Sequence, residues 1–355
     1  MILNNSDKTK YEHFVVFQGN EYIEKELSGL AVKYLISESL KKKISIRAFT
    51  DIYRYLNNND IDIIHTHLIK PYSIAGLVNI LLRKKLIFNY HGIFLKNNPY
   101  YNIFEKSIYR IIQYLINNFS KTDVVLVPSE KSRQLLREET KLFPEPLVYY
   151  NGYPLKPDLP KANPIIAQQL EELRKYKHII AVIGRLEIDK RIDQAVLLIK
   201  NLVDKKLKVH LIVFGDGSLL EELNQLIKKY QLIDSVEMFG YVKDIENYFK
   251  YLDVVLFTSD WEGMPLTMWE SMANGVPIVA PNVGGFKEII EANNCGFIYE
   301  PNDLKEAENK ILELIKDESK RKYLGQNGKS VIEKKYNNKE FIKQIENIYS
   351  KLMSE

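Results

Sequence analysis

The sequence predicts an α/β protein made of two doubly wound parallel sheets, and three observations support that prediction. Strand-length apolar runs alternate with helix-length segments along the chain, which is typical of parallel sheets covered on both faces. The 355 residues suffice for about two domains. A proline-rich break interrupts the alternation near the middle, and the series of strands then starts again. Ligands of such domains bind at the carboxyl ends of the strands, so we expect a crevice between two facing domains.

The strands are predicted from runs rich in β-branched and apolar residues. In the first half these runs lie at residues 13–17, 31–36, 61–66, 86–90, 123–127 and 147–150. In the second half they lie at residues 179–183, 208–214, 236–239, 254–257, 277–280 and 296–299. Helical patterns separate them, for example at residues 195–203, 219–230 and 304–315.

The break at residues 152–160 contains three prolines and one glycine, and it predicts the boundary between the domains. We therefore expect a first domain over residues 1–155 and a second domain over residues 156–337. Residues 338–355 are expected to form a C-terminal helix that packs back toward the first domain.

Composition excludes several classes of protein. A single cysteine, Cys295, rules out an intramolecular disulfide framework and suits a reducing cytoplasm. No apolar run approaches the roughly 20 residues that span a bilayer, and the first residues lack the features of a signal peptide. Residues 1–160 carry 22 Lys and Arg against 16 Asp and Glu. This excess indicates either an anionic partner or dispersed surface lysines, and it is too small to favour nucleic acid. We expect a cytoplasmic protein.

The most informative segment runs from Glu262 to Glu270, directly after the predicted strand 254–257. Pro265 suits the first position of a helix, whose free N–H groups and positive dipole end form an anion site. Eight residues at helical rise separate the two carboxylates by roughly 12 Å. That distance is about the combined length of a sugar, a diphosphate and a ribose. Carboxylates accept hydrogen bonds well from the hydroxyls of the sugar and of the ribose. Two solvated acids at a helix end are the alternative.

Gly184 ends the strand 179–183 and is followed by Arg185 and Lys190. An arginine and a lysine five residues apart on a loop can converge on a diphosphate. Asp189 is predicted to cap the next helix, with Lys190 in its first turn. A cation is unfavourable at a helix N-terminus, which favours a ligand role, although solvated surface cations remain an equal alternative.

Other strand ends carry weaker signals. Gly215 follows one strand and allows close approach of a ligand, while the segment Gly240–Val242 follows another and could read a base edge. Each is more often a plain turn. His65 and His67 share one face of a strand, but no acid or cysteine nearby completes a metal site. His91 follows the next strand, where it could donate to a sugar hydroxyl or a phosphate.

Residues 104–121 are predicted to form an amphipathic helix, with apolar residues at Phe104, Ile108, Ile111, Ile112, Leu115, Ile116 and Phe119. Packing of this stripe on the sheet is the favoured interpretation. With Lys106, Arg110 and Lys121, the helix could instead lie on an anionic membrane surface.

Together these motifs resemble glycosyltransferase family 4, the retaining nucleotide-sugar transferases of the GT-B fold. The resemblance covers nearly the whole chain and implies two Rossmann-like domains that face a central cleft. It implies that Glu262 holds hydroxyls of the donor sugar and that Glu270 holds the ribose. By the same resemblance Arg185 and Lys190 bind the phosphates, and His91 is a catalytic histidine.

The expected catalytic residues are therefore His91, Arg185, Lys190 and Glu262. The expected donor-binding residues are Gly184, Gly215, Gly240, Tyr241, Val242, Gly263, Met264, Pro265, Leu266 and Glu270. Gly284 and Gly285 match a glycine pair that lies downstream in the family.

The chain departs from the family pattern in two places. Arg191 stands where glycine is usual after the lysine, and we expect this change to be tolerated. Only residues 1–10 precede the segment that resembles the family's second strand. One strand–loop–helix unit of at least about 30 residues is therefore expected to be absent, which would expose unpaired strand edges.

The resemblance implies a retaining transferase that moves a sugar from a UDP- or GDP-sugar to a saccharide or lipid-linked acceptor. Bacterial surface polysaccharide synthesis is the expected setting, and peripheral contact at the cytoplasmic face of the membrane is a further candidate interaction. Neither a metal nor another cofactor is expected, because cations and a helix N-terminus would neutralise the leaving diphosphate. Two alternatives stay open. One is a catalytically impaired binding or scaffold subunit, and the other is a nucleotide-sugar hydrolase or epimerase of the same fold.

Overall fold

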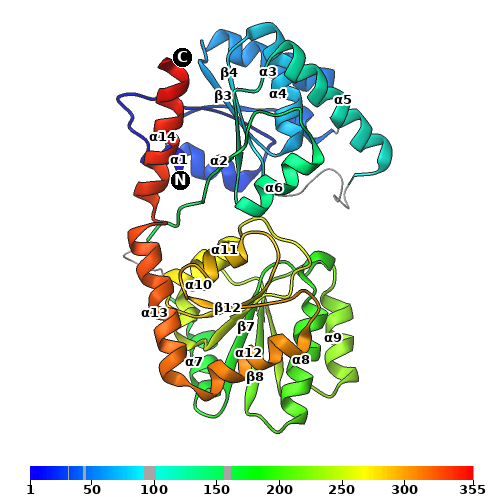
Figure 1. Cartoon of the computed structure of the whole chain (residues 1–355), viewed down its shortest axis with the longest axis vertical. Coiled ribbons are helices and arrows are strands. Elements are labelled where there is room, and N and C mark those ends of the chain that lie inside the picture. The colour runs from blue at the N-terminus through cyan, green and yellow to red at the C-terminus, as the bar shows by residue number, and fades with distance from the viewer. Residues whose placement is uncertain (31, 43–44, 92–100, 156–160, 355) are drawn as a thin grey trace. The chain divides into compact units, whose positions relative to one another are not determined.

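The computed structural model describes the chain apart from residues 31, 43–44, 92–100, 156–160 and 355. It divides into two compact units (Figure 1). Unit 1 comprises Met1–Gly152 and Asn338–Glu355, and unit 2 comprises Tyr153–Asn337. The boundary between Gly152 of unit 1 and Tyr153 of unit 2 thus lies within the proline-rich break at residues 152–160. Residues 156–160 of this break lie outside the described part of the chain.

Unit 1 contains two parallel sheets that are not joined by strand pairing. The smaller sheet pairs β1 (Phe14–Phe17) with β2 (Lys33–Ile36). The larger sheet has the order β3 (Ile63–His67), β4 (Lys85–Asn89), β5 (Val124–Val127) and β6 (Leu147–Val148). Within the described residues, β1 and β3 are therefore both edge strands.

The helices of unit 1 begin where the sequence offers side-chain caps. Asn20, Ser45, Asn102 and Ser129 each accept a backbone N–H at a helix start. The helices are α1 (Ile2–Asn5), α2 (Glu21–Ser28), η1 (Glu38–Lys41), α3 (Ile46–Asn58), α4 (Ile69–Leu82), α5 (Ile103–Phe119), α6 (Glu130–Glu139) and α14 (Asn338–Ser354).

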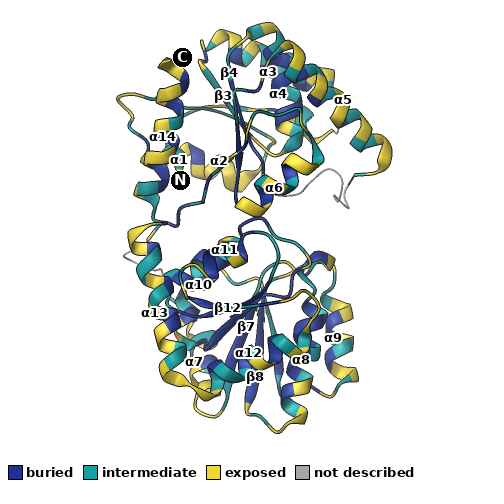
Figure 2. Cartoon of the chain, viewed as in Figure 1, coloured by how far each residue is buried: buried dark blue, intermediate teal, exposed yellow. Residues whose placement is uncertain are grey.

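The C-terminal helix α14 belongs to the core of unit 1. Its apolar face, which includes Phe341 and Ile345, packs against Ile87 of β4 and Leu126 of β5. The other face of the sheet has its own core, in which Tyr72 of α4 stacks on Phe88 of β4. Helices therefore cover both faces of this sheet, and its central strands β4 and β5 are largely buried (Figure 2).

Unit 2 contains one six-stranded parallel sheet in the order β12-β11-β10-β7-β8-β9. The strands are β7 (His178–Ile183), β8 (Val209–Phe214), β9 (Val236–Gly240), β10 (Val254–Leu256), β11 (Ile278–Pro281) and β12 (Gly296–Tyr299). The helices are α7 (Pro164–Arg174), η2 (Ile188–Lys190), α8 (Ile192–Asp204), α9 (Leu220–Lys229), η3 (Ile245–Tyr251), α10 (Leu266–Ala273), α11 (Phe286–Ile290), α12 (Leu304–Lys316) and α13 (Glu318–Lys334).

The strand order of unit 2 sets the position of its ligand edge. From β7 the chain adds β8 and β9 on one side, and then returns to add β10, β11 and β12 on the other. The order therefore reverses between β7 and β10, and open α/β sheets bind ligands beside such a reversal, at the carboxyl ends of the strands. All twelve predicted strands are present, and both units have the predicted parallel α/β architecture.

Candidate functional site

The main predicted motifs of unit 2 lie on the two segments that follow β7 and β10, the neighbouring strands between which the strand order reverses. Strands β7 and β10 pair directly, with Ile180 opposite Val254 and Ala181 opposite Val255. The segment after β7 carries Arg185 and Lys190, and the segment after β10 carries Glu262. Two segments that lie far apart in the sequence therefore meet at one edge.

Lys190 and Glu262 form the centre of this meeting point. The ammonium Nζ of Lys190 lies 2.6 Å from Oε1 of Glu262, and both side chains are largely buried at 20% and 8% exposure. The hydroxyl of Ser259 donates to the same carboxylate oxygen at 2.8 Å. The carboxylate is thus held by a cation and a hydroxyl, which fixes its direction.

Backbone contacts fasten the two segments to each other. The N–H of Asp260 donates to the carbonyl of Asp189 at 2.9 Å, and the hydroxyl of Thr258 donates to the carbonyl of Lys190 at 2.8 Å. Thr258 and Ser259 were not predicted from the sequence. The only signal for them was a pair of small polar residues at the end of an apolar strand.

The predicted capping role of Asp189 is wrong. Asp189 lies inside η2, and the residue that precedes α8 is Arg191, which has a left-handed φ of 48°. A short 3₁₀ turn followed by this left-handed residue carries the chain into α8, so Asp189 sits before the helix start. Lys190 ends η2 and is not in the first turn of α8 either. The argument from an unfavourable helix dipole therefore does not apply.

Asp189 instead lies buried beneath Arg185. Its side chain is 2% exposed, and its Oδ2 lies 3.7 Å from Nη2 of Arg185, which is 61% exposed. Neither carboxylate oxygen has a hydrogen bond within the described part of the chain. The guanidinium therefore remains open to solvent while one buried carboxylate lies near it.

Arg191 adopts a left-handed φ at the position where the family resemblance led us to expect glycine. Only glycine adopts a left-handed φ without steric cost, which is about 1–2 kcal/mol for other residues. Here the guanidinium of Arg191 lies 3.2 Å from Asp193 and 3.2 Å from Asp260. These ion pairs offset part of that cost and attach the turn to the Glu262 segment.

The helix after Glu262 starts later than predicted. α10 begins at Leu266, and Pro265 is its N-cap instead of its first helical residue. Only Leu266 to Glu270 lie on the helix, so the separation of about 12 Å expected from helical rise does not describe the two glutamates. Gly263 and Met264 are buried, whereas Leu266 is 55% exposed. The predicted residues are thus distributed between a loop and one helical turn.

The glycine pair predicted downstream supports this loop. The N–H of Gly285 donates to the carbonyl of Gly263 at 2.9 Å. Gly284 has a φ of 54°, and a Cβ there would overlap the carbonyl oxygen of Glu262. Glycine is therefore required for this close approach of two backbones.

Three further predicted glycines follow neighbouring strands. The N–H of Gly184, at the end of β7, donates to Phe214, and the N–H of Gly215 donates to Gly240 of β9 at 2.8 Å. A Cβ on Gly215 would overlap the carbonyl of Gly184. Tyr241 follows Gly240 and is 78% exposed. The structure therefore brings the predicted donor-binding turns of unit 2 to one edge of its sheet.

His91 belongs to unit 1 and has two histidine neighbours there. Its Nε2 lies 3.0 Å from Nδ1 of His67, and the two rings stack with centroids 5.3 Å apart. His67 stacks in turn on His65 at 4.7 Å. Burial lowers the pKa of His65 to about 3 and that of His67 to about 4, and it also lowers the pKa of His91. His65 is therefore neutral at neutral pH. His67 and His91 are exposed at the surface, and for these two rings only the direction is used, a pKa lowered toward the neutral ring. No group of three or more potential metal ligands was found in the described residues.

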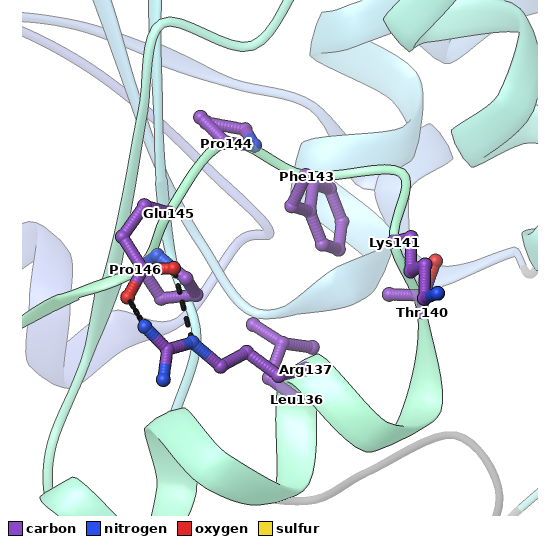
Figure 3. A pocket seen from close by; sticks show the side chains of 8 residues that line it. All are labelled: Leu136, Arg137, Thr140, Lys141, Phe143, Pro144, Glu145 and Pro146. Carbon is purple, nitrogen blue, oxygen red and sulfur yellow. Dashed lines mark hydrogen bonds and ion pairs between the residues drawn. The ribbon is translucent and has the colours of Figure 1, made fainter.

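A hollow of about 310 Å³ in unit 1 was not predicted from the sequence (Figure 3). It is lined by Leu136, Arg137, Thr140, Lys141, Phe143, Pro144, Glu145 and Pro146. Arg137 already donates to Glu145, as Figure 3 shows, so its charge is paired. The hollow lies where α6 ends and β6 begins. The hollow therefore lies at the amino edge of the parallel sheet, where the strands begin. His91 comes after the end of β4 and lies at the opposite, carboxyl edge.

The predicted packing of the amphipathic helix on the sheet holds for only part of its apolar stripe in α5. Tyr109, Gln113 and Ile116 are buried. The exposed large residues are Ile103 at 85%, Phe104 at 73%, Ile111 at 60%, Tyr114 at 55% and Phe119 at 62%. No helix among the described residues combines the length and the apolarity needed to cross a membrane.

Comparison with known families covers most of the chain in two parts. The model described as "Glycosyltransferase Family 4" matches residues 11–157, and the model described as "Glycosyl transferases group 1" matches residues 166–331.

Comparison with individual proteins gives relatives that include two bacterial glycosyltransferases. The chain is 28% identical over 197 residues to the capsular polysaccharide biosynthesis glycosyltransferase CapM of Staphylococcus aureus, covering 54% of this chain and 51% of CapM. It thus spans about half the length of that relative. It is 24% identical over 304 residues to the UDP-Gal:alpha-D-GlcNAc-diphosphoundecaprenol alpha-1,3-galactosyltransferase of Escherichia coli, covering 81% of this chain and 76% of that enzyme.

Among solved structures, the chain resembles Anabaena HepE in complex with UDP-glucose. The TM-score is 0.79 at 20% identity, and the match covers 95% of this chain and 91% of HepE. At this identity the likeness concerns the fold alone.

Proposed function

Since the chain belongs to the family 4 glycosyltransferases and has their GT-B fold, we propose that it transfers a sugar from a nucleotide-diphosphate sugar to a saccharide or lipid-linked acceptor. We propose a UDP- or GDP-sugar as the donor and retention of configuration at the transferred carbon. CapM is named for capsular polysaccharide biosynthesis, and the E. coli relative acts on a diphosphoundecaprenol-linked sugar. These names support a role in bacterial surface polysaccharide synthesis.

The observation that most supports this proposal is the ion pair between Lys190 and Glu262 at the strand reversal of unit 2. Beside it lies Arg185, whose side chain is 61% exposed. A sugar diphosphate offers anionic phosphates next to hydroxyl groups. It therefore matches an edge that presents two cations next to a carboxylate.

Each predicted residue has a role in this proposal. Arg185 and Lys190 bind the diphosphate and stabilise its charge as it leaves, so that neither a metal nor another cofactor is needed. The carboxylate of Glu262 accepts hydroxyls of the donor sugar, and that of Glu270 accepts the ribose hydroxyls. The backbone of residues 263–266 binds the diphosphate and the sugar, and residues 240–242 contact the base. His91 acts in catalysis, and the leaving phosphate takes the proton of the acceptor.

We also propose that unit 1 contacts an anionic membrane surface through α5. Phe104 and Ile111 are exposed on this helix, and both would be expected in a core if the helix served packing alone. Arg110 is exposed between them, and Lys121 is exposed just after the helix. Exposed apolar and basic groups on one helix match the acyl boundary and the headgroups of an anionic bilayer.

Steady-state kinetics with a panel of UDP- and GDP-sugars tests the proposal. We expect Glu270→Ala chiefly to raise the KM for the donor and Arg185→Ala chiefly to lower kcat. Matched exposed controls are Glu318→Ala and Lys322→Ala on α13, which should change neither constant. Unchanged kinetics in both site variants would refute the assignment of these residues.

Two other outcomes point to the alternatives. Nucleotide release without any acceptor would indicate a hydrolase or an epimerase. Nucleotide binding without turnover of any donor would indicate a binding or scaffold subunit.

A further inference from the structure

The three stacked imidazoles of unit 1 form a row that continues into the C-terminal helix. His65 and His67 lie on β3, two residues apart and on one face, and His91 follows β4. At the inner end of the row, Nδ1 of His65 lies 2.8 Å from the hydroxyl of Tyr349 on α14. At the outer end, Nδ1 of His67 lies 3.0 Å from Nε2 of His91.

The inner end of the row has a preferred tautomer. The Nε2 atom of His65 is buried and has no partner. A buried N–H without an acceptor is rarer than a buried acceptor without a donor. The proton of His65 therefore belongs on Nδ1, where it is donated to the hydroxyl of Tyr349.

The outer end of the row leaves one atom of His91 available. Two neutral imidazoles share a hydrogen bond only if one ring donates and the other accepts. Because Nε2 of His91 is engaged with His67, Nδ1 is the nitrogen that can meet a ligand. The oxygens of a sugar or a phosphate need a donor there, so His91 must carry its proton on Nδ1.

From this geometry we propose that His67 is a positioning residue for His91, an inference that rests on the proposed transferase function. The Nδ1–H of His67 donates to Nε2 of His91, which fixes the tautomer of His91 and leaves its Nδ1–H to donate to a substrate oxygen. His65 supports His67 by stacking, and Tyr349 holds His65 in place. Among the described residues, the titratable groups in contact here are the three histidines themselves and Tyr349 at the inner end of the row.

Two substitutions of His67 separate this role from a structural one. In His67→Asn the amide nitrogen takes the place of Nδ1 and can still donate to His91. In His67→Leu the volume is similar but the donor is lost. Because one net hydrogen bond corresponds to about a tenfold change in rate, we expect His67→Leu to lower kcat about tenfold. The KM for the donor should stay within about twofold, and His67→Asn should recover most of kcat.

The nitrogen-15 shifts of the imidazole ring of His91 report its tautomer without any turnover. In the full-length protein labelled at histidine, we expect the Nδ1–H form of His91 in the wild type and in His67→Asn, and a mixture of tautomers in His67→Leu. The signals of His91 are assigned by their loss in His91→Phe. Unchanged shifts in His67→Leu, or equal effects of the Asn and Leu variants, would overturn the proposal. If no donor is turned over, the proposed function fails, but the tautomer measurement still decides the role of His67.

Discussion

The substitution Gly284→Ala tests how the Glu262 loop is held. Gly284 lies in the turn before α11 and has a φ of 54°. An added Cβ would lie 2.8 Å from the carbonyl carbon of Glu262 and 2.9 Å from the carbonyl oxygen of Gly263. Both neighbours are backbone atoms, so they cannot swing away as the end of a side chain can. The loop that carries Glu262 must therefore move.

The expected cost has two parts. A left-handed φ costs alanine about 1–2 kcal/mol relative to glycine. Overpacking against fixed atoms adds about 1–3 kcal/mol. We therefore expect the free energy of unfolding to fall by about 2–5 kcal/mol. Displacement of the loop should also weaken donor binding by at least about tenfold, because Glu262 and the backbone of residues 263–266 would no longer meet the ligand together.

A matched control separates the two parts. Gly275 also has a positive φ, of 70°, but a Cβ there would lie 3.7 Å from its nearest neighbour, the carbonyl oxygen of Gly325. Gly275→Ala should therefore lose only about 1–2 kcal/mol and should bind nucleotide normally.

Urea unfolding gives the two free energies, and isothermal titration with UDP and GDP gives the affinities. The reasoning fails if Gly284→Ala and Gly275→Ala lose equal stability and bind nucleotide equally well. That result would mean that the backbone of the Glu262 loop adapts to the extra methyl group without moving its ligand-binding atoms.

Three other predictions follow from the described contacts. Lys190→Met leaves the largely buried carboxylate of Glu262 without its cation, so the free energy of unfolding should fall by about 1–3 kcal/mol. Adding Glu262→Gln should restore stability but not transferase activity, and a double-mutant cycle by urea unfolding shows whether the two changes are coupled. Because burial lowers the pKa of His65 to about 3, the unfolded chain binds a proton there below about pH 6.5 while the folded chain does not. The contribution of His65 to the free energy of unfolding is therefore complete above about pH 6.5 and should fall by about 1 kcal/mol per pH unit below it. Urea unfolding at pH 7 and pH 5.5 should show a smaller loss of stability in His65→Phe than in the wild type. An equal loss in both proteins would contradict the assignment of this pH dependence to His65. Phe104→Glu with Ile111→Glu should release the protein from anionic vesicles in sedimentation assays, whereas Tyr323→Glu, at a residue 58% exposed on α13, should not.

The fold was largely predictable because its strands are strongly apolar. Segments such as 179–183 and 208–214 read as buried strands from composition alone, and the structure confirms them as β7 and β8. The start of α8 was not predictable in the same way. It depends on a left-handed φ at Arg191, and nothing in the residue type arginine signals that conformation.

The candidate site was predictable residue by residue but not as an arrangement. Lys190 and Glu262 were both singled out, yet their ion pair depends on β10 lying next to β7, which the order of strands along the chain does not reveal. The bond between His67 and His91 likewise depends on the register of β3 against β4. Local patterns identify strand ends, whereas strand order and register are set by packing of the whole sheet.

Isothermal titration of the whole chain with UDP and with GDP tests the central claim most directly, because the claim is that unit 2 binds a nucleotide-diphosphate sugar at its strand reversal. We predict saturable binding of one of the two nucleotides. Binding should weaken at least about tenfold in Glu270→Ala and remain unchanged in the exposed control Glu318→Ala. Failure of both nucleotides to bind, or equal affinity of Glu270→Ala and the wild type, would contradict the account.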